Sequence, residues 1–449
     1  MLWPDEVWPQ DIGALVILDG RDLLDVDGRF RIEVVTAAIE GRLHLVPRFR
    51  QRLHIPGRWR GGPLWVDAPG FDLTDHVRVA PLSAPGDEAQ LLLATERLRR
   101  RRMDRSRPLW EMWFLPGLAE KRIGVFVRMH HAMADGMAGV ATLGTLLDAV
   151  PDASVARARP WTPAPLPSER DLFVDTLRRR VDDLGRALST LARPVSSVRR
   201  VVAAWPAMRE IFAEEPGPET SLDRRVGPDR TVALIRSRID LVREFAHAHD
   251  AKVDDVLLTV IAGGLRELLR RRGETIEGVI IPIYVPVSLH QQQRGDARGN
   301  LVSQMVVPLP IGESDPGRRL RQIAAETAKR KARSHPNLGI LFHGGIAGRI
   351  AGRAIVKLIN RQRVNVTSTD LPGPQTPLYL AGARLLEVFP MLPLIGQESL
   401  GVGALSYAGQ FNIMAVADKD AYPDIEVFAE GARDELNVLE MEVHNVVVA

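Results

Sequence analysis

The chain has 449 residues, a net charge of +3 and no cysteine, and its apolar and charged fractions are 45% and 26%. This length predicts at least two domains. The near-balanced charge argues against a polyanion binder, and the absence of cysteine excludes disulfides, thiolate nucleophiles and Cys-ligated metal centres. No apolar run approaches the roughly 20 residues that span a bilayer, and Asp5 and Glu6 stand where a signal peptide carries cations. We therefore expect neither signal-peptide secretion nor an integral membrane protein, whereas peripheral membrane contact stays open.

The first 150 residues alternate between strand and helix patterns. Residues 12–18 predict a strand that ends at a tight turn, and 30–40 predict a helix. The β-branched and aromatic stretch 123–129 predicts a buried strand, with a helix following over 137–149. We expect this part, 1–150, to form an N-terminal α/β domain.

A proline-rich stretch then separates two parts of the chain. Pro160, Pro163, Pro165 and Pro167 exclude a helix or central strand and predict an extended linker. Apolar residues from Phe173 to Leu191 recur at spacings of three and four, which predicts an amphipathic helix after the linker. A second helix is expected at 198–212.

The remaining chain predicts another α/β unit. The predicted elements are strands at 231–235 and 279–287, a hairpin at 400–417, and helices at 254–271 and 424–440. We therefore divide the chain into an N-terminal domain (1–150), a linker with amphipathic helices (151–228) and a C-terminal domain (229–449).

The sharpest candidate for chemistry is the sequence His-His-Ala-Met-Ala-Asp-Gly at 130–136, between the predicted strand and helix. Adjacent residues of an extended chain point to opposite sides, so one of the two histidines is expected to face a cleft. Imidazole titrates near neutral pH and can take a proton from a hydroxyl. The same residues have simpler explanations, because Asp135 could cap the helix and Gly136 could supply a turn.

Other templates do not match. The chain has no Gly-x-Ser-x-Gly elbow, no phosphate-binding glycine loop after a strand and no His-Glu-x-x-His pair. The basic run Arg99 to Arg102 lacks interleaved aromatic residues, so it predicts a solvated helix face rather than a nucleic-acid site. We expect no metal, no cofactor and no nucleic-acid partner.

HHxxxDG is the signature of the CoA-dependent acyltransferase superfamily, which includes chloramphenicol acetyltransferase and peptide-synthetase condensation domains. Within it, the chain resembles the bacterial wax ester synthase/diacylglycerol acyltransferase family over nearly its whole length. The matching blocks, in family order, are Ser106-Arg107-Pro108-Leu109-Trp110-Glu111, the motif itself, Pro286-Val287-Ser288, Gly299-Asn300 with Ser303, and Pro372-Gly373-Pro374 continuing to Tyr379.

The resemblance implies two chloramphenicol-acetyltransferase-like domains, an α/β (α+β) fold with mixed sheets flanked by helices, and a tunnel at their interface. It implies that His131 is the general base for transfer of a long acyl chain from acyl-CoA, a substrate, to diacylglycerol or a long-chain alcohol. Candidate catalytic residues are His131, His130, Asp135 and Gly136. Candidate substrate-binding residues are Pro108, Leu109, Trp110, Asp254, Asp255, Ser288, Asn300, Ser303, Pro372 and Gly373.

Two departures from the family pattern bear on activity. The family usually has Asn-Asp where this chain has Asp254-Asp255, and Asn where this chain has Asp370. An ionised aspartate cannot donate a hydrogen bond to an oxyanion as asparagine can. The opening segment before the first strand is also shorter than in the family.

These departures keep two alternatives open: a superfamily enzyme with another acceptor, such as an amine or polyketide hydroxyl, and a non-catalytic lipid or CoA binder. Because long-chain substrates partition into membranes, the resemblance also implies a cytoplasmic protein that is peripherally associated with the inner membrane face or with lipid bodies. The amphipathic helix over 173–191 is the candidate contact, and packing of that helix across the two domains is the alternative.

Overall fold

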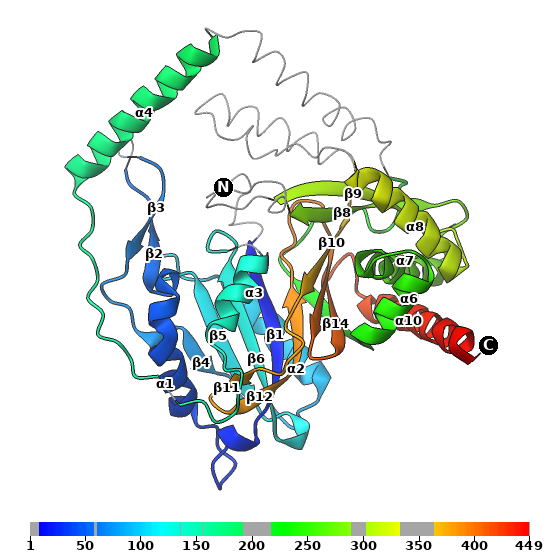
Figure 1. The fold of residues 1–449 in the computed structure, drawn as a ribbon, viewed down its shortest axis with the longest axis horizontal. Helices are drawn as coiled ribbons and strands as arrows, with labels where there is room; N and C mark the ends of the chain where they lie inside the picture. The colour runs from blue at the N-terminus through cyan, green and yellow to red at the C-terminus, as the bar shows by residue number, and fades with distance from the viewer. Residues whose placement is uncertain are drawn as a thin grey trace.

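The described part of the chain folds into two six-stranded sheets that lie side by side, each with helices against it (Figure 1). The computed structural model describes residues 9–57, 61–134, 136–154, 156–191, 217–288, 302–332 and 363–448. A small two-stranded sheet, formed by β2 (Gln51–His54) and β3 (Leu64–Asp67), accompanies the N-terminal part. This arrangement confirms the predicted α/β class with two sheet-containing units.

The first sheet has the strand order β11-β12-β1-β6-β5-β4. Its strands are β1 (Asp11–Asp19), β4 (Val77–Val79), β5 (Trp110–Pro116), β6 (Arg122–His130), β11 (Tyr379–Leu380) and β12 (Ala383–Met391), and its helices are α1 (Ile32–Arg42), α2 (Glu88–Arg100) and α3 (Gly136–Gly144). The central strand β1 is apolar on both faces, because successive side chains point to opposite sides. Val16 therefore packs in one core, whereas Leu15 packs in another.

The second sheet has the order β7-β14-β13-β10-β8-β9, and helices cover one of its faces (Figure 1). Its strands are β7 (Arg230–Arg238), β8 (Ile280–Ser288), β9 (Val302–Pro310), β10 (Val366–Pro372), β13 (Leu400–Tyr407) and β14 (Gln410–Asp418), and its helices are α6 (Ile239–Ala248), α7 (Val253–Arg271), α8 (Pro316–Lys331) and α10 (Ile425–Val448). Helix α7 is apolar almost all round because it lies buried in the helical layer, where α10, α8 and α6 all contact it.

A segment of the C-terminal half joins the N-terminal sheet. Strand β12 pairs antiparallel with β1, which places Met391 opposite Gly13. The same strand packs against β13 and β14 of the second sheet. The expected C-terminal unit, 229–449, thus contributes strands to both sheets, and β12 connects the two sheets beside the motif-bearing strand β6.

The predicted elements largely match those observed. The strands at 12–18, 123–129, 231–235 and 279–287, the hairpin at 400–417 and the helices at 30–40, 254–271 and 424–440 correspond to β1, β6, β7, β8, β13–β14, α1, α7 and α10. The helix after the motif is shorter than predicted, since α3 ends at Gly144. The predicted helix over 198–212 lies outside the described residues.

Candidate functional site

The two histidines of the motif lie at the end of β6, where three chain segments meet. His130 N–H donates to the carbonyl of Leu109 at 2.9 Å, and His131 N–H donates to the carbonyl of Gln10 at 2.8 Å. These bonds fix the loop between the start of β5 and the start of β1. The loop therefore begins on a rigid scaffold, as a catalytic group requires.

The two imidazoles differ in exposure. His130 is 3% exposed, and its Nδ1 accepts the N–H of Ala132 at 3.0 Å. Because Nδ1 accepts, the neutral ring carries its proton on Nε2. His131 is only partly buried. The geometry thus gives His130 a loop-holding position and leaves His131 as the accessible imidazole.

The Pro108-Leu109-Trp110 block lies in the core beside the motif. All three residues are buried. The Trp110 indole N–H donates to the carbonyl of Phe49 at 2.9 Å. The indole also stacks on the Phe49 ring, with the ring centroids 4.4 Å apart. Since the carbonyl of Leu109 also accepts the His130 N–H, this block supports the loop that carries the motif. Pro108 and Trp110 border a different, arginine-lined cavity of about 360 Å³.

A buried ion cluster lies directly behind the motif, and the sequence reading missed it. Arg128 is 1% exposed; its Nη1 donates to Asp11 at 3.1 Å and its Nη2 donates to Glu111 at 2.8 Å. Nη1 also donates to the backbone carbonyl of Arg99 at 3.0 Å. One guanidinium therefore ties β1, β5 and α2 to β6, two residues before His130. The sequence signal for this cluster was an acidic residue at the start of each of two apolar strands, Asp11 in β1 and Glu111 in β5.

An apolar cavity of about 320 Å³ lies between the two sheets against both flanks of the motif. Met129 lines it before the histidines, and Gly136 and Val140 of α3 line it after them. Leu371 of β10 and Leu405 of β13 close the side formed by the second sheet. We call this cavity the apolar chamber. Its lining matches the hydrocarbon of a lipid rather than a polar ligand.

Gly136 and Gly373 differ in the space that their surroundings leave for a side chain. A Cβ on Gly136 would meet Leu371 Cδ2 at 3.5 Å, so α3 lies close to β10. A Cβ on Gly373 would lie 2.4 Å from the carbonyl oxygen of Ser406, a distance that excludes any side chain. Gly373 and the preceding Pro372 therefore shape the end of β10, and neither presents a polar side chain to the apolar chamber.

The remaining predicted residues are placed as follows. Asp255 is 3% exposed; it accepts from the Lys252 N–H at 2.9 Å and from the Thr327 hydroxyl at 2.6 Å, so it caps the first turn of α7 and ties that helix to α8. Ser288 and Ser303 lie near the paired ends of β8 and β9. Asp135 and Asn300 lie outside the described residues. The structure thus brings Met129, Gly136 and β10 together at the apolar chamber, and Asp255 is not part of its lining.

The two positions that depart from the family pattern face each other. Burial raises the pKa of Asp370 from 3.8 to about 7, and the charge of Asp254 and a hydrogen bond with it add to this effect. Lys331, whose Nζ lies 2.9 Å from Asp254, acts in the opposite direction. Because Thr369 and Leu371 line the apolar chamber, alternation along β10 directs Asp370 to the other side, toward α7.

The coupled carboxyls predict a pH-dependent stability. The folded protein binds the Asp370 proton more tightly than the unfolded chain does, so stability falls as pH rises through about 7. Asp370→Asn removes this ionisation. We expect the variant to raise the free energy of unfolding by about 2 kcal/mol at pH 8, and by less than half of that at pH 5.

Urea unfolding of both proteins at the two pH values measures this difference. The exposed Asp27→Asn is the matched control and should change neither value. An equal effect of Asp370→Asn at both pH values would contradict the raised pKa.

The predicted solvated face over Arg99 to Arg102 is wrong at its first residue. Arg99 is 8% exposed, and its Nη2 donates to the carbonyl of Leu392 at 2.8 Å. Among the residues that the structure covers, no group of three or more His, Asp or Glu is arranged to hold a metal ion. Nor does any helix in the described ranges have the length and apolar character to cross a membrane.

Comparison with known proteins agrees with this architecture. Residues 6–257 match the wax ester synthase/diacylglycerol acyltransferase catalytic domain, and 298–440 match the C-terminal domain of the same family. A probable diacylglycerol O-acyltransferase of Mycobacterium tuberculosis is 30% identical over 441 residues, covering 94% of this chain and 89% of the relative.

Two solved structures show the same fold. The wax ester synthase/diacylglycerol acyltransferase of Marinobacter aquaeolei VT8 superposes with a TM-score of 0.69 at 21% identity, over 98% of this chain and 97% of that one. The starter condensation domain of rhizomide synthetase, in complex with C8-CoA and Leu-SNAC, gives 0.56 at 15% identity, over 98% and 90%. Both the predicted resemblance and the predicted fold class are confirmed. The chain belongs to the wax ester synthase/diacylglycerol acyltransferase family of O-acyltransferases.

Proposed function

We propose that this protein transfers a long-chain acyl group from acyl-CoA to the hydroxyl of diacylglycerol or of a fatty alcohol, with His131 as general base. The observation that carries the proposal is the apolar chamber against both flanks of the motif. A chamber lined by residues on both sides of a partly buried histidine in the sequence suits a substrate with a long hydrocarbon chain and a reacting polar end. Relatives named for diacylglycerol acylation support the choice of acceptor.

The reaction needs one proton carrier and no covalent acyl-enzyme. The His131 imidazole takes the proton of the acceptor hydroxyl while the oxygen attacks the thioester carbon. The carbon–sulfur bond then breaks, and the imidazolium returns the proton to the CoA thiolate. The chain has no cysteine to form a thioester of its own, which is consistent with direct transfer.

The scaffold around the motif supplies positioning. His130 holds the loop through the Ala132 N–H, and Arg128 ties together the strands beneath it. Holding both substrates beside one base turns a reaction between separate molecules into one within a complex. We do not assign Asp370 the role of hydrogen-bond donor to the oxyanion, because its position on β10 turns its side chain away from the apolar chamber.

The test is an assay of the purified protein with palmitoyl-CoA and either dioleoylglycerol or hexadecanol, which follows thiol release and ester formation together. We expect thiol and ester in equal amounts with at least one acceptor. Thiol release without ester would favour a different acceptor, such as an amine. No thiol release with either acceptor would favour a non-catalytic binder.

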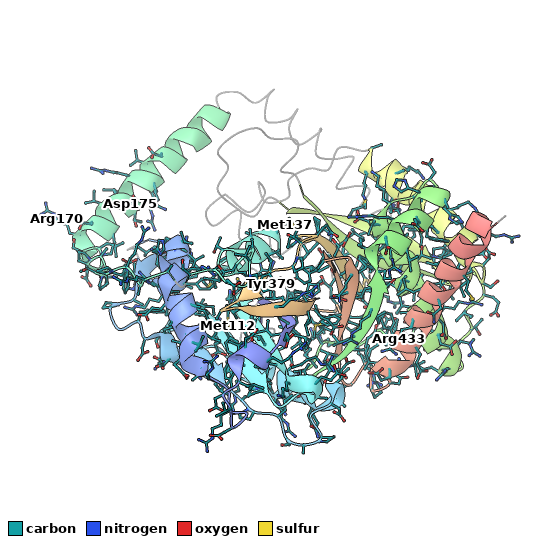
Figure 2. All side chains as sticks on the ribbon, turned by 60° about the horizontal axis from the view of Figure 1, so that its bottom comes forward. Met112, Met137, Arg170, Asp175, Tyr379 and Arg433 are labelled. Carbon is teal, nitrogen blue, oxygen red and sulfur yellow. The ribbon has the colours of Figure 1, made fainter. Side chains whose placement is uncertain are left out.

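We further propose that α4 (Glu169–Leu191) contacts a membrane or lipid-body surface. The helix stands away from both sheets, and Figure 2 shows Arg170 and Asp175 on it at the edge of the molecule. Phe173, Leu177 and Val181 lie on one stripe and are 51%, 52% and 61% exposed. Exposed apolar side chains at helical spacing beside basic ones suit an interfacial helix. These exposures argue against packing of this stretch across the two domains.

Flotation with phosphatidylglycerol-containing vesicles tests the role of α4. The Phe173→Ser, Leu177→Ser variant loses two apolar side chains from the exposed stripe, so we expect its vesicle-bound fraction to fall about tenfold or more. The control replaces Leu45 and Leu93, which are 53% and 43% exposed elsewhere, with serine. Equal binding by the two double variants would contradict the assignment.

A further inference from the structure

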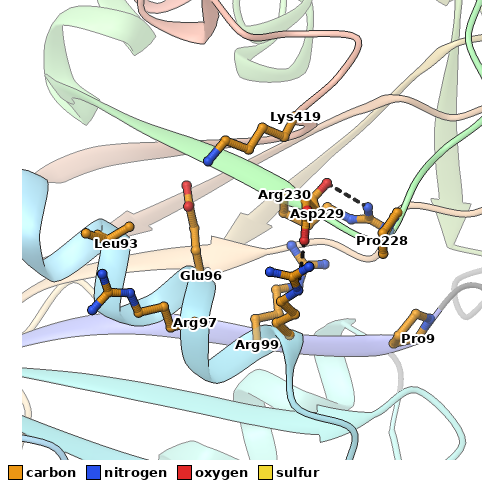
Figure 3. Close-up of a pocket in the computed structure, with 10 residues that line it drawn as sticks. Pro9, Leu93, Glu96, Arg97, Arg99, Pro228, Asp229, Arg230 and Lys419 are labelled. Carbon is orange, nitrogen blue, oxygen red and sulfur yellow. Dashed lines mark hydrogen bonds and ion pairs between the residues drawn. The ribbon is translucent and has the colours of Figure 1, made fainter.

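A second cavity, of about 220 Å³, lies where α2 meets the beginning of β7, on the junction of the two sheets (Figure 3). Five cationic side chains line it: Arg97, Arg99, Arg100, Arg230 and Lys419. Only two acidic side chains, Glu96 and Asp229, share the lining. Figure 3 shows the α2 residues on one side and the residues of the C-terminal half on the other. The cavity therefore carries an excess of positive charge.

Arg99 is the buried member of this group. It is 8% exposed, and its Nη1 is buried with no hydrogen-bond partner among the described residues. Burial lowers the pKa of Arg99 to about 9, with Arg230 and Arg128 adding to the effect. The carboxylate that opposes this shift, Asp11, is already bound to Arg128 at 3.1 Å. Arg99 thus remains charged at neutral pH without a carboxylate of its own.

The other charges around the cavity do not neutralise Arg99. Asp229 pairs with Arg100 at 2.9 Å, and the Nη1 of Arg230 lies 3.6 Å from Asp418 and donates to backbone carbonyls. Burial raises the pKa of Glu96, and the nearby charge of Lys419 opposes this shift. The acids near the cavity therefore interact with cations other than Arg99.

A buried guanidinium with an N–H that has no acceptor lowers the stability of the fold unless an anion pairs with it. Arginine N–H groups match the oxygens of a phosphate, and such charge-assisted bonds are strong. We propose that the cavity between α2 and β7 binds a phosphate group, with the Nη1 of Arg99 as the buried donor and Arg97, Arg230 and Lys419 as the surrounding cations. The phosphate can come from two sources, inorganic phosphate or the 3′-phosphate of CoA; the second source rests on the proposed function.

Thermal melts at constant ionic strength test for the site with inorganic phosphate. We expect phosphate to raise the melting temperature of the wild type, and Arg99→Met to weaken the apparent affinity about tenfold or more. Without phosphate, Arg99→Met should melt at or above the wild-type temperature, since it removes an unpaired buried charge. Lys419→Met changes an exposed side chain and should weaken the affinity less. Arg170→Met, on α4, is the matched control and should leave the affinity unchanged.

Titration with CoA and with dephospho-CoA separates the two sources. Tighter binding of CoA by the wild type, with the difference lost in Arg99→Met, identifies CoA as the source. Equal binding of both compounds, together with a phosphate-dependent melt, identifies inorganic phosphate. If neither phosphate nor CoA distinguishes the wild type from Arg99→Met, the proposal is overturned. None of these measurements requires turnover, so a failed acyltransferase assay leaves this test independent.

Discussion

His131→Ala is expected to reduce ester formation from palmitoyl-CoA by about 10²- to 10⁴-fold, the usual contribution of a positioned general base. His131 is only partly buried and follows the end of β6, two residues after Met129, which lines the apolar chamber. The loop hydrogen bond of His131 uses its backbone N–H, which alanine keeps. The melting temperature should therefore stay within about 2 °C of the wild type.

His130 provides the matched control, because its imidazole holds the loop. His130→Ala loses the acceptor for the Ala132 N–H and should lower both the melting temperature and turnover. In His130→Asn the amide oxygen can replace Nδ1, so this variant should recover part of the lost stability. Turnover by His131→Ala above a tenth of the wild-type rate would remove His131 from the mechanism.

Arg128→Met is expected to lower the free energy of unfolding by about 3–5 kcal/mol, because it removes the guanidinium that pairs with the buried Asp11 and the partly buried Glu111. Asp11 is 4% exposed, and Glu111 is also bound by the Trp113 indole at 3.0 Å. Urea unfolding followed by tryptophan fluorescence measures the loss.

Two further variants test whether the stability loss in Arg128→Met comes from the buried charges. The triple variant Arg128→Met, Asp11→Asn, Glu111→Gln removes all three charges and should recover a substantial part of the stability. Arg122→Met, on the same strand but more exposed, should cost less than about 1 kcal/mol. A loss below about 1 kcal/mol for Arg128→Met would show that the ion cluster does not hold the motif strand.

Local patterns predicted the parts of the fold that depend on near neighbours in sequence. The apolar run of β6 and the spacing in α7 each reflect one buried strand or helix, and both predictions are confirmed. The motif was recognisable because its residues are consecutive. The helix after it was predicted too long, because the apolar residues beyond Gly144 pack as a short turn segment instead.

The missed features all join segments far apart in sequence. Strand β12 pairs with β1 across more than half of the chain, and no local periodicity encodes that partner. Arg99 was read as solvated because its neighbours are basic, yet α2 turns it toward Leu392. Likewise, Asp254 and Asp370 were treated as two separate departures, whereas the fold places them in one coupled pair.

The central claim is that the apolar chamber beside His131 receives the acyl chain of the substrate. Photolabelling with palmitoyl-CoA that carries a diazirine at the end of its chain, followed by peptide mapping, tests this claim most directly. The account predicts labels on α3, β10 and β13, and loss of those labels when unmodified palmitoyl-CoA competes. Labels confined to α4 or to other surface helices, with none on the lining of the apolar chamber, would contradict it.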